Sequence, residues 1–256
     1  MTPILAFDIE TVPDCAGIRK IHDLPAELPD ADVAEIAFQK RRVQSGGSSD
    51  FLPVHLHRVV VISCVLRSDD GLRIFSLGEP QDDEAGAIQR FFDGLEKYVP
   101  QLVTWNGRNF DLPVLVSRGM IGAVRAACFW ETGGESKYNN YVNRFHDRHV
   151  DLMDVLAIYG GRGSPLDELA RLAGFPGKLG VGGGAVWDSY LAGKVDAIRN
   201  YCEADTVNTY LLYLRFQMMR CAYTPERYAS ECALLRATLE KRGEPHWREF
   251  LERWTP

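Results

Sequence analysis

Long apolar runs are missing from the sequence. No segment is long enough to span a membrane, and the first residues carry no basic leader with a small-residue cleavage site. The six cysteines are scattered without a C-x-x-C pair, so the sequence predicts neither a zinc site nor a disulfide framework. Together these absences favour a cytoplasmic protein in a reducing compartment, without a membrane partner.

An excess of positive charge is also missing, because 29 Lys and Arg residues stand against 35 Asp and Glu residues, a net charge of −6. This balance argues against a protein that coats duplex DNA through a basic surface. It remains compatible with a nucleic-acid enzyme whose local positive field comes from bound metal ions. The glycine-rich segment 177–184, GKLGVGGG, is not a phosphate-binding P-loop, because it lacks the G-x-x-x-x-G-K-[ST] pattern.

The composition is that of an ordinary globular protein, 46% hydrophobic and 25% charged over 256 residues, without an internal repeat. This length predicts one α/β domain over residues 1–256. We expect its core to cover about residues 1–215, followed by a helical tail over about 216–256.

Hydrophobic patterning predicts three strands first, then alternating helices and strands, and finally helices. This order favours a mixed sheet flanked by helices, with a site at the carboxyl ends of strands. The expected strands are 3–9, 58–66, 72–78 and 101–105, and the segment 149–160 begins as a short strand or enters a helix. The expected helices are 30–44, 82–99, 164–175, most of 185–223 and the charged tail, and the first of them lies within the long connection 13–57. For the helix 164–175, Ser164 is expected as N-cap and Pro165 at the first helical position.

Two carboxylates close the first apolar run, ILAFDIET at residues 4–11. Side chains alternate along a strand, so Asp8 and Glu10 point to the same face with their Cα atoms roughly 7 Å apart. Two neighbouring carboxylates repel each other when they are desolvated. Either the strand ends here and both groups are solvated, or the pair binds a hard divalent cation, which takes oxygen ligands.

Further acids follow at two distant places. Asp111 comes after the strand 101–105, where it either joins the first pair at the sheet edge or serves as N-cap of the next helix. Asp205 lies within a helix rich in Tyr and Leu, four residues after Tyr201. The i, i+4 spacing puts both side chains on one helix face, so a phenol and a carboxylate can approach the same site.

These residues form three motifs in order, D-x-E at 8–10, N-x-x-x-F-D at 106–111 and Y-x-x-x-D at 201–205. They resemble the three exonuclease motifs of the DEDD superfamily in its DEDDy form. The chain is similar, from residue 4 to about residue 215, to stand-alone bacterial proteins predicted to be 3′–5′ exonucleases, which are related to the exonuclease domain of family B DNA polymerases. It departs from those polymerases by lacking the polymerase part, so proofreading in cis is not expected.

The resemblance implies a ribonuclease H-like α/β fold, with a mixed five-stranded sheet flanked by helices and a helical C-terminal extension. It also implies two Mg²⁺ or Mn²⁺ ions and in-line hydrolysis of phosphodiester bonds from the 3′ end of single-stranded DNA. By this resemblance Asp8 bridges the two ions, while Glu10 and Asp205 complete the ion that binds the attacking water. Asp111 supports the second ion, and Tyr201 orients the water.

Contacts to nucleic acid are expected at four further positions. Thr11 either touches the terminal nucleotide or merely ends the strand. Asn106 belongs to the second motif, and Phe110 either stacks against a base or packs in the core. Lys178 is expected near the substrate phosphate. The other polar candidates have structural interpretations, since Asp151 is expected to cap a helix, and no metal site is expected at the histidines 55 and 57.

Two alternatives to a DNA exonuclease stay open at this point. One is a 3′–5′ exoribonuclease, because recognition of the 2′-OH cannot be read from the sequence. The other is a nucleic-acid-binding domain that keeps the fold without catalysis. The presence of all four acids and Tyr201 favours an enzyme. The sequence identifies no polymerase or repair partner.

Overall fold

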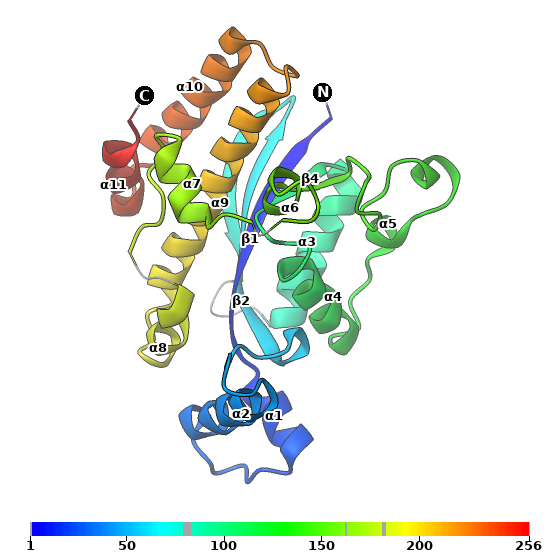
Figure 1. Cartoon of the computed structure of the whole chain (residues 1–256), viewed down its shortest axis with the longest axis vertical. Helices are drawn as coiled ribbons and strands as arrows, with labels where there is room; N and C mark the ends of the chain where they lie inside the picture. Colours follow the sequence, from blue (N-terminus) through cyan, green and yellow to red (C-terminus); the bar gives the residue numbers. More distant parts are fainter. Residues whose placement is uncertain (1, 79–82, 162, 181–182, 256) are drawn as a thin grey trace.

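A computed structural model describes residues 2–78, 83–161, 163–180 and 183–255 of the chain (Figure 1). One mixed sheet has the strand order β3-β2-β1-β4-β5. β1 pairs antiparallel with β2 and parallel with β4. At the two edges of the sheet, β3 pairs antiparallel with β2, and β5 pairs parallel with β4. The predicted five-stranded mixed sheet flanked by helices is therefore confirmed. The strands are β1 (Ile4–Pro13), β2 (His57–Ser68), β3 (Gly71–Leu77), β4 (Gln101–Thr104) and β5 (His149–Asp151).

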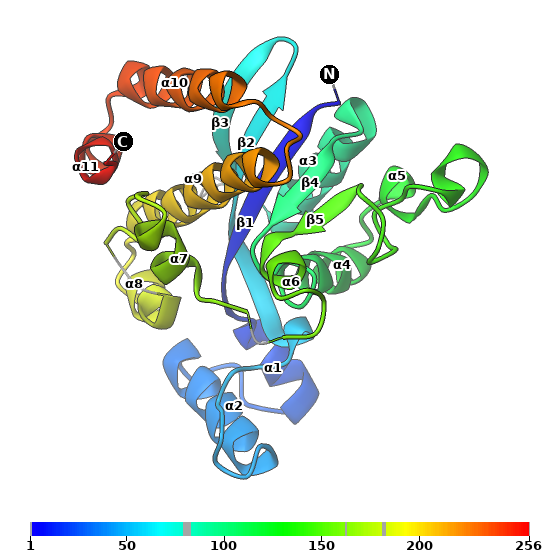
Figure 2. The same ribbon diagram turned by 45° about the horizontal axis from the view of Figure 1, so that its top comes forward.

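Alternation along β1 sends its apolar side chains into two different helix layers. Leu5, Phe7 and Ile9 pack with α3 (Glu84–Tyr98) and α4 (Asp111–Ile121) on one face. Ile4 and Ala6 face the opposite layer, which is built mainly from α9. Figure 2 shows α9 lying across this face of the sheet, with α10 and α11 beyond it. Asp8 and Glu10 continue the face that α9 covers.

The long helix α9 (Val195–Met219) contains neither Gly nor Pro and contacts both β1 and β2. Its middle, from residue 201 to 214, is buried on all sides. An acid in this part is therefore not on a solvated helix face. Helix α8 (Val186–Leu191) precedes α9, so most of 185–223 is helical as expected, although in two helices. Gly193, with φ +70°, follows α8 and ends that helix.

The expected N-cap of the helix over 164–175 is wrong. Helix α7 (Leu166–Leu172) has Pro165 as its N-cap residue, without a side-chain cap hydrogen bond, so Ser164 lies outside the helix. The reason is the extended backbone of Pro165, whose ψ is 139°. Of the expected helix over 82–99, residue 82 lies outside the described residues, and α3 begins at Glu84 after a capping Asp83.

The connection 13–57 forms a small helical unit past the carboxyl end of β1 (Figure 1). The predicted helix 30–44 agrees with α2 (Asp30–Gln44), and α1 (Cys15–His22) precedes it. Ile18, Val33 and Leu52 belong to a core of their own in this unit. The remaining elements are α5 (Ala127–Trp130), α6 (Leu152–Leu156), α10 (Pro225–Arg242), α11 (Pro245–Arg253) and the 3-10 turns Val54–Leu56, Gly134–Lys137 and Gly183–Ala185. Within the ranges described, no helix is both long and apolar enough to cross a membrane.

Candidate active site

One cleft of about 1040 Å³ opens where β1 runs past the end of β4. Its walls come from β1, α2, the loops after α2 and β4, α8 and α9, together with Met153 and the chain before and after α7. All nine site residues predicted from the sequence line this cleft, although they come from four separate segments of the chain. They are Asp8, Glu10, Thr11, Asn106, Phe110, Asp111, Lys178, Tyr201 and Asp205.

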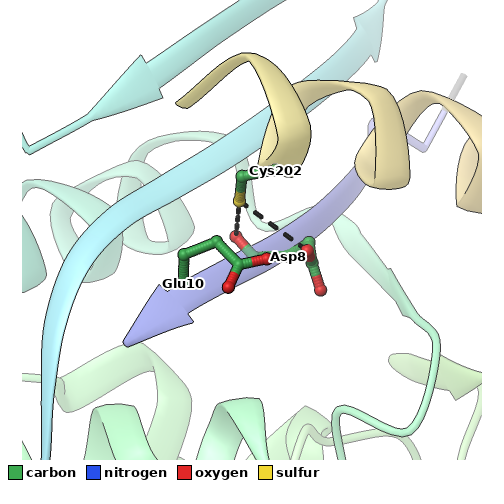
Figure 3. Close-up of side chains that lie close together, drawn as sticks. All are labelled: Asp8, Glu10 and Cys202. Atoms are coloured by element: carbon green, nitrogen blue, oxygen red, sulfur yellow. Dashed lines mark hydrogen bonds between the residues drawn. The ribbon is translucent and has the colours of Figure 1, made fainter. Parts of the chain in front are cut away.

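Asp8 and Glu10 form the floor of the cleft from the centre of the sheet. They pair with Ser63 and Val61 of β2, which fixes both carboxylates on the face toward α9. Each is only half-buried, so both remain open to the cleft. Ligand atoms of Asp8, Glu10 and Cys202 lie within 4.8 Å of one another, the arrangement drawn in Figure 3.

Asp111 joins this floor through a backbone contact. β4 pairs with β1 only as far as Ala6, so the Ile9 N–H lies beyond that ladder and requires another acceptor. Asp111 Oδ1 accepts from it at 3.1 Å. The N-cap position of α4 belongs to Phe110, and Asp111 is the first residue of the helix. The Asp111 carboxylate is therefore hydrogen-bonded to the backbone of β1, and the alternative that Asp111 is the N-cap of α4 does not hold.

The loop that delivers Asp111 is held by Asp151 at the end of β5. The two carboxylate oxygens of Asp151 accept from the backbone N–H groups of Asn106 and Arg108, each at 2.9 Å. Asn106 itself has a left-handed backbone, φ 66°, which Asn tolerates better than most residues. Asp151 also accepts from the first N–H groups of α6, so the predicted capping role is confirmed. It thereby fixes the second motif relative to the sheet.

Tyr201 and Asp205 enter the cleft from one face of α9, as their spacing predicts. Lys178, from the loop after α7, reaches both of them. Its Nζ donates to the Tyr201 hydroxyl at 2.6 Å and lies 3.5 Å from Asp205 Oδ2. Asp205 Oδ1 is buried and has no hydrogen-bond partner among the residues that the structure describes.

Cys202 is a neighbour of the acids that the sequence did not reveal. Its thiol donates to the backbone oxygen of Asp8 at 3.5 Å and lies 3.7 Å from Asp8 Oδ2 (Figure 3). Burial, and then the charges of Asp8 and Glu10, raise the pKa of this thiol well above its usual value. Cys202 is therefore a neutral donor to Asp8 and not a thiolate. The signal in the sequence that could have indicated this position is that Cys202 directly follows Tyr201 of the third motif.

Thr11 and the aromatic residues line the cleft on the other side of β1. Thr11 follows an irregularity in the β1–β2 register and faces away from Glu10, with its Oγ1 2.9 Å from His57 Nδ1. Phe110 packs partly into the core around α3 and α4 and also lines the cleft, so its core packing is observed and its contact with a base stays a prediction. His57 belongs to no group of potential metal ligands found within the described ranges.

The pKa values of the four carboxylates are all raised. Burial, followed by repulsion from the other acids, raises the pKa of Asp8 and of Glu10 well above the usual range. Burial raises the pKa of Asp111 to about 7, against the opposing effect of the Ile9 N–H. Burial raises that of Asp205 to about 6, although Lys178 and the Tyr201 hydroxyl lower it. Such a cluster is unfavourable until cations neutralise it.

The donor set fits hard divalent cations. Carboxylate oxygens predominate, which suits Mg²⁺ or Mn²⁺, and Cys202 is held as a protonated thiol. Asp205 Oδ1 supplies a buried oxygen without a partner among the described residues. The residues present can therefore hold metal in this cleft, which is the chemistry expected of a carboxylate cluster of this kind.

Comparison with known families matches residues 49–254 to a family described as a predicted 3′–5′ exonuclease related to the exonuclease domain of PolB. The matched segment includes Asp111, Tyr201 and Asp205, whereas Asp8 and Glu10 precede it. A search of curated proteins found no match. Because the match covers most of the sequence, the chain belongs to this family of predicted 3′–5′ exonucleases.

Proposed function

We propose that the protein is a metal-dependent 3′–5′ exonuclease that hydrolyses single-stranded DNA from its 3′ end. The observation that carries this proposal is the convergence of four carboxylates and one phenol in a single cleft, from segments up to 197 residues apart (205 − 8). Family membership supports the reaction and its polarity. The four acids together argue against a domain that keeps only the fold.

Asp8, Glu10, Asp111 and Asp205 are the residues proposed to hold two Mg²⁺ or Mn²⁺ ions. When bound, such ions supply a nucleophilic water at neutral pH and stabilise charge on the attacking and leaving oxygens. The chain's own task is to hold these ligands in place before metal arrives. The Ile9 N–H fixes Asp111, the register with β2 fixes the first pair, and α9 carries Asp205.

Tyr201 is proposed to orient the attacking water. Burial, and then the neighbouring acids, raise the pKa of its hydroxyl, so it stays protonated at neutral pH. Lys178 already donates to the hydroxyl oxygen, which leaves the phenol's own proton available for another acceptor. The Lys178 ammonium is proposed to meet the substrate phosphate, since its side chain is 40% exposed at the cleft.

Single-stranded substrate is favoured by the walls of the cleft. Thr11, Asn106 and Phe110 are proposed to contact the terminal nucleotides, and the Phe110 ring offers a surface to an unpaired base.

The test is incubation of the purified protein with single-stranded DNA and with RNA, each labelled at the 5′ end, in Mg²⁺, Mn²⁺ or EDTA. We expect a descending ladder on DNA that requires a divalent metal, and no activity from Asp8→Ala. Undiminished degradation in excess EDTA, early release of the 5′ label, or cleavage of a closed circle would overturn the proposal. Degradation of RNA alone would assign the exoribonuclease alternative.

A further inference from the structure

An exposed phenyl ring stands in the wall of the cleft opposite α9. Phe51 lies in the loop between α2 and β2, lines the same cleft as the acids, and keeps 56% of its surface exposed. A large apolar side chain left open inside a functional cleft is more informative than one on the general surface, because it can bury area only against a ligand.

The backbone that carries Phe51 is held on both sides. Arg41 Nε donates to the Phe51 carbonyl at 3.0 Å, and the Phe51 N–H donates to Ser49 Oγ at 3.1 Å. Asp50 pairs with Arg42 at 2.7 Å, and Leu52 is buried in the core of the α1–α2 unit. The ring is thus presented from a fixed position, and little conformational freedom is lost when something packs on it.

Phe51 belongs to a cluster of three rings. Its centroid lies 5.0 Å from that of His57 and 5.4 Å from that of Phe110, and His57 lies edge-on to Phe110 at 5.1 Å. Burial lowers the pKa of His57, so the imidazole is neutral. The Leu52 carbonyl, 3.0 Å from Nε2, accepts the ring proton, and Nδ1 accepts from Thr11. The cluster is therefore uncharged and fixed by its neighbours.

This cluster joins the acids directly. Phe110 precedes Asp111, whose carboxylate is attached to β1, so the apolar surface starts beside the four carboxylates and runs outward to Phe51. A base inserted between two rings needs them about 7 Å apart, twice the stacking distance of roughly 3.4 Å. Phe51 and Phe110 are closer than that and their planes are tilted by 56°, so a base cannot enter between the two rings and can stack on the open face of Phe51.

The polar groups of this wall do not offer an alternative grip on the nucleic-acid backbone. Arg42 is the basic residue of α2 that lines the cleft, and it is paired with Asp50 and lies 3.9 Å from Glu35. Because these acids neutralise it, the wall has little attraction for phosphate. Contact with the faces of bases is the interaction that remains, and it needs no sequence readout.

We infer that Phe51 is a base-stacking residue, whose ring extends the surface of Phe110 and receives a nucleobase of one of the two 3′-terminal nucleotides. This inference rests on the proposed function and names the part of the substrate that the α1–α2 unit recognises. In this proposal the α1–α2 unit binds unpaired bases, while the four acids act at the phosphate.

The test combines protein variants with base deletion. The unmodified protein, Phe51→Ala, Phe51→Trp and Phe145→Ala are compared on a single-stranded DNA 12-mer, intact or abasic at the terminal or the second position. Phe145 is the matched control, since its ring is 73% exposed but lies outside the cleft. Binding is measured by fluorescence anisotropy in EDTA, and cleavage in Mn²⁺ gives kcat and KM separately. Circular dichroism checks that each variant folds.

For Phe51→Ala we expect about tenfold weaker binding and a similar rise in KM on intact DNA, with kcat nearly unchanged. The loss should shrink on one of the two abasic strands, because the deleted base is the partner of the ring. Phe51→Trp should restore binding, and Phe145→Ala should match the unmodified protein. Unchanged binding by Phe51→Ala, or an equal loss on both abasic strands, would overturn the inference.

These outcomes separate the two proposals. DNA cleavage by the unmodified protein together with no coupling between Phe51 and either base would overturn this inference alone. Coupling in the binding assay without cleavage in any divalent metal would overturn the proposed function and leave the stacking role intact. Failure of the protein both to bind single-stranded DNA in EDTA and to cleave it in Mn²⁺ would overturn both.

Discussion

The ammonium of Lys178 donates a hydrogen bond of 2.6 Å to the hydroxyl oxygen of Tyr201. The same Nζ lies 3.5 Å from Oδ2 of Asp205, so one cation links the phenol and the last carboxylate of the cluster. Lys178 also lowers the pKa of Asp8, Glu10 and Asp205 against the dominant effect of burial. A positive charge supplied by the chain therefore already offsets part of the repulsion that metal ions are proposed to neutralise.

Substitution Lys178→Met should lower kcat/KM on single-stranded DNA by about 10²-fold, the low end of what one positioned donor contributes. Mn²⁺ binding should persist, because all four carboxylates remain and the competing ammonium has gone. Single-turnover cleavage and calorimetry with Mn²⁺ measure the two effects. Lys241→Met, an exposed position on α10, is the matched control. An unchanged cleavage rate, or loss of Mn²⁺ binding, would contradict the proposed role.

The carboxylate cluster should make the metal-free protein less stable as pH rises. Burial raises the pKa of Asp111 to about 7, whereas an unfolded chain gives about 3.9. Between these values the folded protein binds more protons than the unfolded chain, so the contribution of Asp111 to the free energy of unfolding decreases with rising pH. Asp205, with a pKa of about 6, acts in the same direction.

Accordingly, Asp111→Asn in EDTA should raise the free energy of unfolding at pH 8 by roughly 1–3 kcal/mol, and the gain should vanish near pH 4. The Asn side-chain oxygen can still accept from Ile9. Urea unfolding of both proteins at each pH measures this difference, with Glu252→Gln on an exposed site of α11 as control. Equal stability of Asp111→Asn and the unmodified protein at pH 8 would show that the buried carboxylate carries no such cost.

The strands and the acids were predictable because their signals are local. Asp8 and Glu10 stand out as acids in an apolar strand, and the spacing of Tyr201 and Asp205 fixes their common helix face. Helix α1 was not predicted, since only two of its eight residues are buried and so few positions show no clear period. Its N-cap, Asp14, is held from far along the chain by Arg118.

The contents of the cleft beyond the motifs depend on packing that no local pattern encodes. Cys202 faces Asp8 only because α9 crosses β1 next to Asp8. A cysteine in an apolar helix otherwise indicates a residue of the hydrophobic core. Phe51 follows a flexible-looking Ser and Gly segment, and its position depends on contacts of Arg41 and Ser49. Long-range contacts of this kind decide which side chains meet, and a single sequence does not report them.

Cys202 should be unreactive despite its place beside the site. A thiolate is the reactive form, and burial next to two carboxylates raises the pKa of this thiol far above neutral pH. Iodoacetamide at pH 8 should therefore alkylate the exposed Cys221 and leave Cys202 unmodified, with nuclease activity retained. Peptide mass spectrometry gives the modified positions. Rapid alkylation of Cys202 in the folded protein would mean that its thiol is accessible and ionised.

Tyr201→Phe should slow cleavage of single-stranded DNA while metal binding stays intact. A neutral phenol contributes little to holding a divalent cation, and the four carboxylates remain in the variant. What is lost is the hydroxyl that Lys178 holds in the cleft and that is proposed to orient the attacking water. Groups positioned in this way contribute about 10²–10⁴-fold, and we expect a loss of about 10²-fold because no charge is removed.

Asp8→Ala and Asp205→Ala should instead abolish the reaction together with Mn²⁺ binding, since each removes a carboxylate from the floor or wall of the cleft. Single-turnover cleavage and Mn²⁺ calorimetry on the three variants separate the two roles, and Tyr138→Phe, an exposed tyrosine, is the matched control for the loss of a hydroxyl. If Tyr201→Phe cleaves as fast as the unmodified protein, Tyr201 is a packing residue of α9. If it loses Mn²⁺ as completely as Asp8→Ala, the phenol belongs to the metal-holding set, and the division between orienting water and holding metal is wrong.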